Sequence, residues 1–191
     1  MGYKSLLLAT MLCAALNVSG KPHLHGSGTL FIAQDNNLWQ LQFVLPASDV
    51  VGFEHKPENS LQAKKALSQS EIMRSASNLF VIPTSCEVTS TDLILPFDIE
   101  MPSSDEHEHA HDHKHDHEHE NEHKDAQKHE EKAHLDFEVT YVLNCASTIN
   151  QIDMSLFEHY PSLNELEVLK ITENGQSNSM ISAQSARVML K

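Results

Sequence analysis

One stretch of the sequence, residues 103–134, limits what this chain can fold into. Ten of the fourteen histidines lie there, and from His107 to His119 a histidine occupies every second position. Asp, Glu, Lys and Ala separate these histidines, and residues 103–133 contain no Val, Ile, Leu, Phe or Trp. A segment without such side chains cannot offset the entropy that folding costs. We therefore expect residues 103–133 to form a long disordered loop inserted into a folded domain.

The same stretch has the composition of a metal-binding segment. Neutral imidazole binds Zn, Cu, Ni and Co, and zinc prefers four ligands in a tetrahedron. The carboxylates between the histidines add ligands or attract cations. We predict several weak sites whose affinity falls as pH drops toward the ordinary histidine pKa of about 6.5. The candidate ligands here are His107, His109, His111, His113, His115, His117, His119, His123, His129 and His134. The alternative is an acidic linker with incidental histidines.

The first twenty residues have the pattern of a secretory signal peptide. Lys4 precedes an apolar run at 6–16, and small residues close the segment at 19–20. This pattern predicts a signal peptide at 1–20 and a single metal-binding domain at 21–191. The formal net charge is −14, and residues 105–133 contribute about half of it, with eleven Asp/Glu against four Lys. Such a chain should repel nucleic acid and anionic lipid, and we expect no membrane insertion.

Two cysteines, Cys86 and Cys145, remain outside the predicted signal peptide. An even pair in an exported chain predicts one disulfide, which would join the two sides of the histidine-rich insertion. A pair of thiolate metal ligands is the alternative.

The rest of the sequence predicts an α+β domain of mostly antiparallel strands with one packed helix. Apolar residues alternate with polar ones in several segments, as they do in half-buried strands. Asn59 or Ser60 can cap a helix over 61–78 that packs through Leu61, Ala66, Leu67, Met73, Ala76 and Phe80. The expected strands are 29–33, 38–45, 79–82, 91–95, 135–143 and 152–156, a hairpin over 163–182, and an edge strand at 187–190.

Four further residues outside the insertion are candidate metal ligands. His23 and His25 repeat the spacing of one intervening residue, and on an extended strand both would point to one face. Glu54 and His55 follow a short apolar segment, and we expect His55, with or without Glu54, to lie near His23 and His25. Solvated surface side chains are the alternative for all four. His134 begins the polar face of the strand at 135–143, where a solvated face explains the pattern equally well.

No sequence feature predicts an enzyme. Residues 119–123 match the H-E-x-x-H string of zinc peptidases. That chemistry needs a docked helix, and the flanking residues have no apolar stripe. A nucleophile elbow, a phosphate-binding loop and a Cys-x-x-Cys pair are also absent from the sequence.

Several short segments together resemble a known family. They are 23–26 (HLHG), 51–55 (VGFEH), Cys86 before the insertion, 134–137 (HLDF) and 141–145 (YVLNC). In this order they are similar to the ZrgA-like family of bacterial periplasmic zinc-binding proteins. The resemblance implies a periplasmic protein that captures zinc and assists a zinc ABC transporter or its binding protein. A buffer for nickel, cobalt or copper and a structural domain with an incidental loop are the alternatives. A two-lobed transport receptor would need a longer chain.

Overall fold

A computed structural model describes residues 25–99 and 135–191 of the chain. The predicted signal peptide, His23, the insertion at 103–133 with its histidines, and His134 lie outside the described residues.

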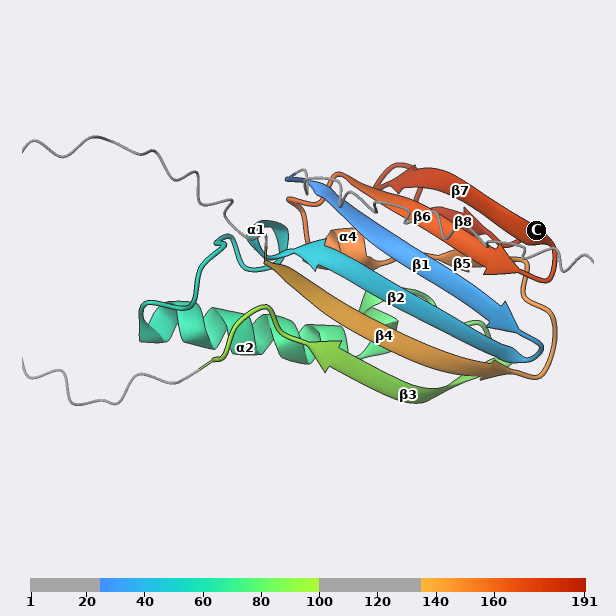
Figure 1. Cartoon of the computed structure of the whole chain (residues 1–191), viewed down its shortest axis with the longest axis horizontal. Helices are drawn as coiled ribbons and strands as arrows, with labels where there is room; N and C mark the ends of the chain where they lie inside the picture. Colours follow the sequence, from blue (N-terminus) through green and yellow to red (C-terminus); the bar gives the residue numbers. More distant parts are fainter. Residues whose placement is uncertain (1–24, 100–134) are drawn as a thin grey trace, which may run out of the picture.

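Six strands form one mixed sheet in the order β3-β4-β2-β1-β6-β7 (Figure 1). The strands are β1 (Ser27–Asp35), β2 (Leu38–Pro46), β3 (Cys86–Ile94), β4 (Asp136–Cys145), β6 (Glu165–Thr172) and β7 (Gly175–Ser182). All neighbours run antiparallel except β1 and β6, which pair in parallel. The short strands β5 (Gln151–Asp153) and β8 (Arg187–Met189) form a separate antiparallel pair. The prediction of a mostly β, single-domain fold is confirmed.

Alternation of apolar and polar residues explains the two central strands. In β2 the predicted apolar face is buried, and in β4 every second residue from Phe137 to Leu143 is fully buried. Because successive side chains of a strand point to opposite faces, this alternation gives the sheet one apolar inner face. The buried residues of these strands are Trp39, Leu41, Phe43, Leu45, Phe137, Val139, Tyr141 and Leu143.

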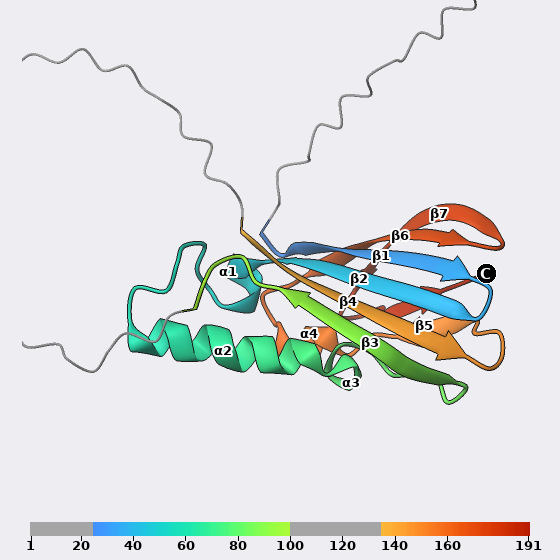
Figure 2. The same cartoon turned by 60° about the horizontal axis from the view of Figure 1, so that its bottom comes forward.

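Helices cover the inner face of the sheet. Figure 2 shows α2 (Ser60–Arg74), α3 (Ala76–Leu79) and α4 (Leu156–His159) on one side of it, and α1 (Ala47–Val50) follows β2 directly. The predicted cap is confirmed, since the Asn59 side chain accepts a hydrogen bond from the Gln62 amide. Phe80, after α3, stacks on Phe43 with ring centroids 6.2 Å apart. The helical layer thus closes a single core.

Several local predictions are wrong. The helix ends at Arg74, because Ser75 adopts an extended conformation before α3 begins. Leu61 and Leu67 of α2 face solvent, with 76% and 40% of their surface exposed. The segment 79–82 is not a strand; Phe80 forms only an isolated bridge with Met154. The edge strand expected at 187–190 is present as β8, but it pairs with β5 in the separate two-stranded sheet and does not extend the main sheet.

The Tyr141 hydroxyl joins the sheet to α2. It donates a hydrogen bond to the Met73 carbonyl, and burial raises the pKa of Tyr141 well above its ordinary value. We expect Tyr141→Phe to lower the free energy of unfolding by about 1–2 kcal/mol, because the Met73 carbonyl would lose a buried donor. Tyr160→Phe is the matched control. Its buried hydroxyl has no hydrogen-bond partner among the described residues, so removing it should cost little. Equal losses in urea unfolding would contradict this assignment.

One end of the sheet gathers several chain segments that are distant in sequence. The first residues of β1 lie across from the last of β2, at Thr29↔Val44, and β2 ends beside the start of β4, at Pro46↔Asp136. β6 begins at the same end, at Ser27↔Glu165. The turn before β1 and the segment after β2 therefore meet where β4 follows the insertion. Among the described residues, none of the helices has the length and apolar character needed to cross a bilayer.

Candidate metal centre

Two of the predicted ligands meet at this end of the sheet. His25 precedes β1, and Glu54 lies in the turn after α1. The Nδ1 atom of His25 is 3.7 Å from Oε1 of Glu54. Two ligands of one tetrahedral zinc ion, each bound at about 2.0–2.1 Å, lie about 3.3 Å apart. This pair is therefore close to the spacing at which one zinc ion could bind both atoms.

His55 does not join this pair. Its Nδ1 atom is 2.9 Å from the Lys56 carbonyl oxygen and 3.8 Å from Oε1 of Glu58. The imidazole stacks on Phe53 with centroids 5.1 Å apart. In the described residues, no group of three or more His, Cys, Asp or Glu side chains is arranged to hold a metal ion. Of the predicted ligands in the described residues, only His25 and Glu54 are thus brought together, with His55 in the same turn as Glu54.

Asp49, which the sequence analysis missed, lies beside this pair. The Gly26 amide donates a 2.7 Å hydrogen bond to Oδ2 of Asp49, and Ser48 Oγ lies 2.7 Å from His25 Nδ1. Partial burial raises the pKa of Asp49, the Gly26 amide and His25 oppose this rise, and Glu54 adds to it. His25, Asp49 and Glu54 therefore share one electrostatic environment, in which a bound cation would favour the ionised carboxylates.

The sequence contained a pattern that places Asp49 near His25. Pro46 ends a predicted strand, and a hairpin returns the chain to the end where the preceding strand begins. Polar residues directly after Pro46 are therefore expected beside the residues that precede β1. Ser48 and Asp49 are the first two such residues.

Gly26 fixes the geometry of the pair. Its φ is +82°, its amide binds Asp49, and a Cβ placed there would lie 2.3 Å from Nδ2 of Asn164. We expect Gly26→Ala to lower the free energy of unfolding by about 1–2 kcal/mol, because L residues are strained at positive φ. It should also weaken zinc binding, because His25 is the preceding residue.

Gly175→Ala is the matched control for Gly26→Ala. Gly175 has a φ of +114° with open space around its Cβ position, at the β6–β7 turn. It should lose stability through backbone strain and keep the zinc affinity. Equal zinc affinities of the two variants, measured by calorimetry, would contradict a positioning role for Gly26.

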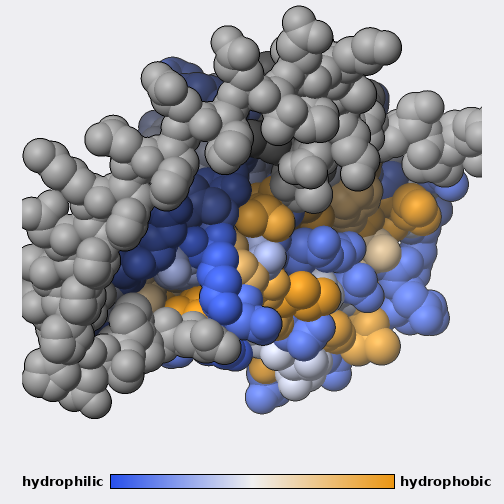
Figure 3. Space-filling view, turned by 60° about the vertical axis from the view of Figure 1, so that its left-hand side comes forward, coloured by the Kyte–Doolittle hydropathy of each residue, from blue (hydrophilic) through white to orange (hydrophobic). Residues whose placement is uncertain are grey.

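Aromatic contacts link this site to the segments that flank the insertion. Phe53 stacks on Phe97 at 5.9 Å, and Phe97 meets Phe137 edge-on at 5.9 Å. The Ala47 amide donates a 2.8 Å hydrogen bond to the carbonyl of Leu135, the residue directly after His134. Figure 3 brings this side of the molecule forward and shows hydrophilic residues beside small hydrophobic patches. The candidate pair therefore lies at the end of the sheet where the chain leads to and from the insertion.

The predicted disulfide between Cys86 and Cys145 is confirmed. It joins the start of β3 to the end of β4, so it lies at the end of these strands away from the insertion. Its sulfur atoms are not ligands of the candidate metal centre.

These features define a single-domain protein with a mixed sheet and a histidine-rich insertion between β3 and β4. The chain belongs to the ZrgA family of zinc uptake proteins, because the model of that family matches residues 22–190. The resemblance noted from the sequence is thereby confirmed, and it assigns the chain a role in zinc uptake. No curated protein sequence matches the chain significantly.

Proposed function

We propose that this chain is a periplasmic zinc-binding protein that captures zinc and assists its uptake. The observation that carries this proposal is the approach of His25 and Glu54, from separate segments, at the end of the sheet next to the insertion. Imidazole nitrogen and carboxylate oxygen are both ordinary zinc donors. The donor set therefore suits zinc as cargo.

Two ligands do not complete a zinc site. His23, two residues before His25, and His134, directly before Leu135, are the nearest further histidines in sequence. His55 lies in the same turn as Glu54 and would reach the site by turning away from Phe53. We propose that His25 and Glu54, completed from these histidines, hold the tighter zinc ion.

The insertion would act as a collector. Its nine candidate histidines, from His107 to His129, are too many for one tetrahedral site and would form several weak, exchanging sites. The carboxylates between them would raise the local cation concentration. Zinc caught there would pass to the tighter site at the adjoining end of the sheet.

The predicted signal peptide at 1–20 and membership of the family support a periplasmic location. In the periplasm, the zinc collected by the chain would be handed to a zinc ABC transporter or to its binding protein. The disulfide is consistent with this oxidising compartment.

Zinc titration calorimetry on two forms of the exported chain tests the proposal. One form is intact, and the other lacks residues 105–133. We expect the shortened form to keep one tight site and to lose the weaker ones. A shortened form that binds no zinc would contradict the role of His25 and Glu54. Equal stoichiometry in both forms would contradict the collector role.

A third form controls for the length and charge of the insertion. In it, the seven alternating histidines of 107–119 are replaced by Asn, while every carboxylate is kept. We expect this form to lose most of the weak sites. Competition titrations with Ni²⁺ or Cu²⁺ in the calorimeter measure the metal selectivity of the chain. A clear preference for either ion over Zn²⁺ would favour a buffering role for that metal.

A further inference from the structure

The sheet has a second face, opposite the helices, which we call the outer face. It carries the residues at alternate positions of the six strands, such as Thr29, Phe31 and Ala33 of β1. No described helix covers it, and Phe31 and Ile171 are 42% and 57% exposed there. In a sheet that packs one face on the core, the opposite face usually carries polar side chains.

The charge on the outer face has a single sign. The strand pairings place seven carboxylates on it: Glu87, Asp92, Asp136, Glu138, Asp35, Glu165 and Glu167. No Lys, Arg or His occupies an outer position of the described strands. The one lysine in these strands, Lys170, points inward, and its Nζ atom donates to the Met189 carbonyl.

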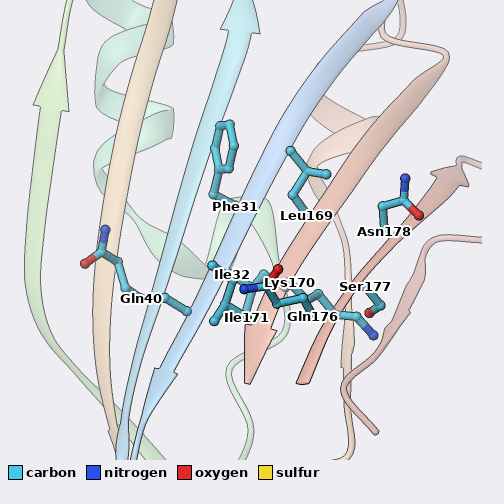
Figure 4. A pocket seen from close by; sticks show the side chains of 10 residues that line it. Phe31, Ile32, Gln40, Leu169, Lys170, Ile171, Gln176, Ser177 and Asn178 are labelled. Atoms are coloured by element: carbon cyan, nitrogen blue, oxygen red, sulfur yellow. The ribbon is translucent and has the colours of Figure 1, made fainter. Parts of the chain in front are cut away.

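An apolar groove lies between these carboxylates. Phe31, Leu169 and Ile171 line it, with Gln176 and Asn178 of β7 along its side, and its volume is about 520 Å³ (Figure 4). Lys170 also contributes to the lining, but its Nζ atom is engaged by the Met189 carbonyl. Phe31, Leu169 and Asn178 belong to one row across three strands, since Phe31 pairs with Leu169 and Leu169 with Asn178. An exposed apolar groove with a polar rim is typical of a binding surface.

The neighbouring edge strand is open to close approach. Among the described residues, β7 pairs with β6 in an unbroken register and otherwise forms only an isolated bridge between Ser182, its last residue, and Ser185. It contains no charged residue and no proline. Edge strands are usually protected by charges, proline or a bulge. β3, at the other edge of the sheet, has a bulge between Val88 and Ser90 and carries Glu87 and Asp92. Within residues 25–99 and 135–191, the edge of the sheet beside the groove therefore lacks these protective features.

We infer that the outer face is a docking site for a partner protein that inserts an apolar side chain into this groove and surrounds it with Lys or Arg. Charge complementarity selects this occupant, because like charges oppose the docking of a second copy of this acidic chain. The same repulsion disfavours the insertion as the occupant, because its residues 105–133 are themselves strongly acidic. The inference does not require zinc binding.

A synthetic peptide, acetyl-Lys-Lys-Thr-Leu-Thr-Phe-Lys-Lys-amide, serves as the probe. It is titrated into the ¹⁵N-labelled exported chain and followed by NMR. We expect shift changes at the amides of Phe31, Leu169, Ile171 and β7, and none on α2. Binding of the peptide should weaken as salt rises, because the rim carboxylates are at least partly exposed to solvent. Peptides with Glu in place of Lys, or with Ser in place of Leu and Phe, should bind at least about tenfold more weakly.

Matched substitutions distinguish binding of the peptide in the groove from non-specific binding to other exposed apolar side chains. Phe31→Ser, or Ile171→Ser if the first variant fails to fold, should weaken the peptide about tenfold. Leu61→Ser removes an apolar side chain of α2 that is more exposed than either of these, at 76%, and should have no effect. Glu165→Lys on the outer face should weaken binding, whereas Glu71→Lys on α2 should leave it unchanged.

Three results would overturn the inference. Shift changes spread equally over α2 and the outer face would show non-specific binding. A dimer in sedimentation that Phe31→Ser dissociates would assign the groove to a second copy of the chain. Shift changes at Phe31 and Leu169 on deleting residues 105–133, without any response to the peptide, would assign the groove to the chain's own insertion.

Discussion

Replacing Cys86 and Cys145 together by alanine is expected to lower the free energy of unfolding by about 4 kcal/mol. The disulfide spans a sequence separation of 59 residues, so it closes a long loop that includes the whole insertion. In the chain-entropy model, a cross-link of this span removes many conformations from the unfolded state. The measurement is urea unfolding of the two proteins under oxidising conditions.

Reduction of the unsubstituted chain is the control for the alanine variant. Cys145 is 2% exposed, so its replacement by alanine also changes core packing. Dithiothreitol breaks the bond and keeps both side chains. The reduced chain should therefore show most of the loss by itself. A loss below about 1 kcal/mol on reduction would contradict the loop-closure argument. A loss seen only in the alanine variant would assign the effect to packing.

Strands with strict alternation were predictable from the sequence. In β2 and β4, apolar residues occupy every second position, and no helix would place all of them on one face. The β6–β7 hairpin was also predictable, because Gly175 provides the positive φ that follows its turn. In these segments, the local pattern and the tertiary burial agree.

The secondary structure of the short apolar run at 79–82 was not predictable from its local pattern. Continuous apolar residues fit a buried strand and a buried helix equally well. Leu79 ends α3, and Phe80 packs against Phe43 and Tyr141 from the helical layer. Contacts that are distant in sequence decided the outcome. The exposure of Leu61 has the same origin, since this residue lies in the first turn of α2 on the side that faces solvent.

The candidate site was predictable in part. The spacing of the histidines identified His25 as a candidate ligand. Glu54 was a candidate because it follows a short apolar segment and directly precedes His55. Their actual approach depends on the hairpin of β1 and β2, which brings the turn before β1 to the segment after Pro46. The roles of Gly26 and Asp49 depend on a hydrogen bond that the Gly26 amide donates to the Asp49 carboxylate, across 23 positions in sequence. No local pattern contains that contact.

Substituting His25 by alanine is expected to weaken the tight zinc site about a hundredfold, and Glu54→Gln should weaken it at least tenfold. Each change removes one of the two donor atoms that lie 3.7 Å apart. The affinities are measured by calorimetry in the exported chain lacking residues 105–133, so that the weak sites of the insertion do not mask the loss. His159→Ala removes a histidine from α4 and is the matched control; it should leave the affinity unchanged.

The double variant decides whether the two residues share one zinc ion. If they do, the second substitution should cost much less affinity than it does alone, because the ion has already lost the site that both residues formed. Independent sites would instead give additive losses in affinity. Additive losses, or a loss in His159→Ala equal to that in His25→Ala, would contradict a common centre. Because Glu54→Gln keeps the size of the side chain, its effect reports the donor oxygen and its charge rather than packing.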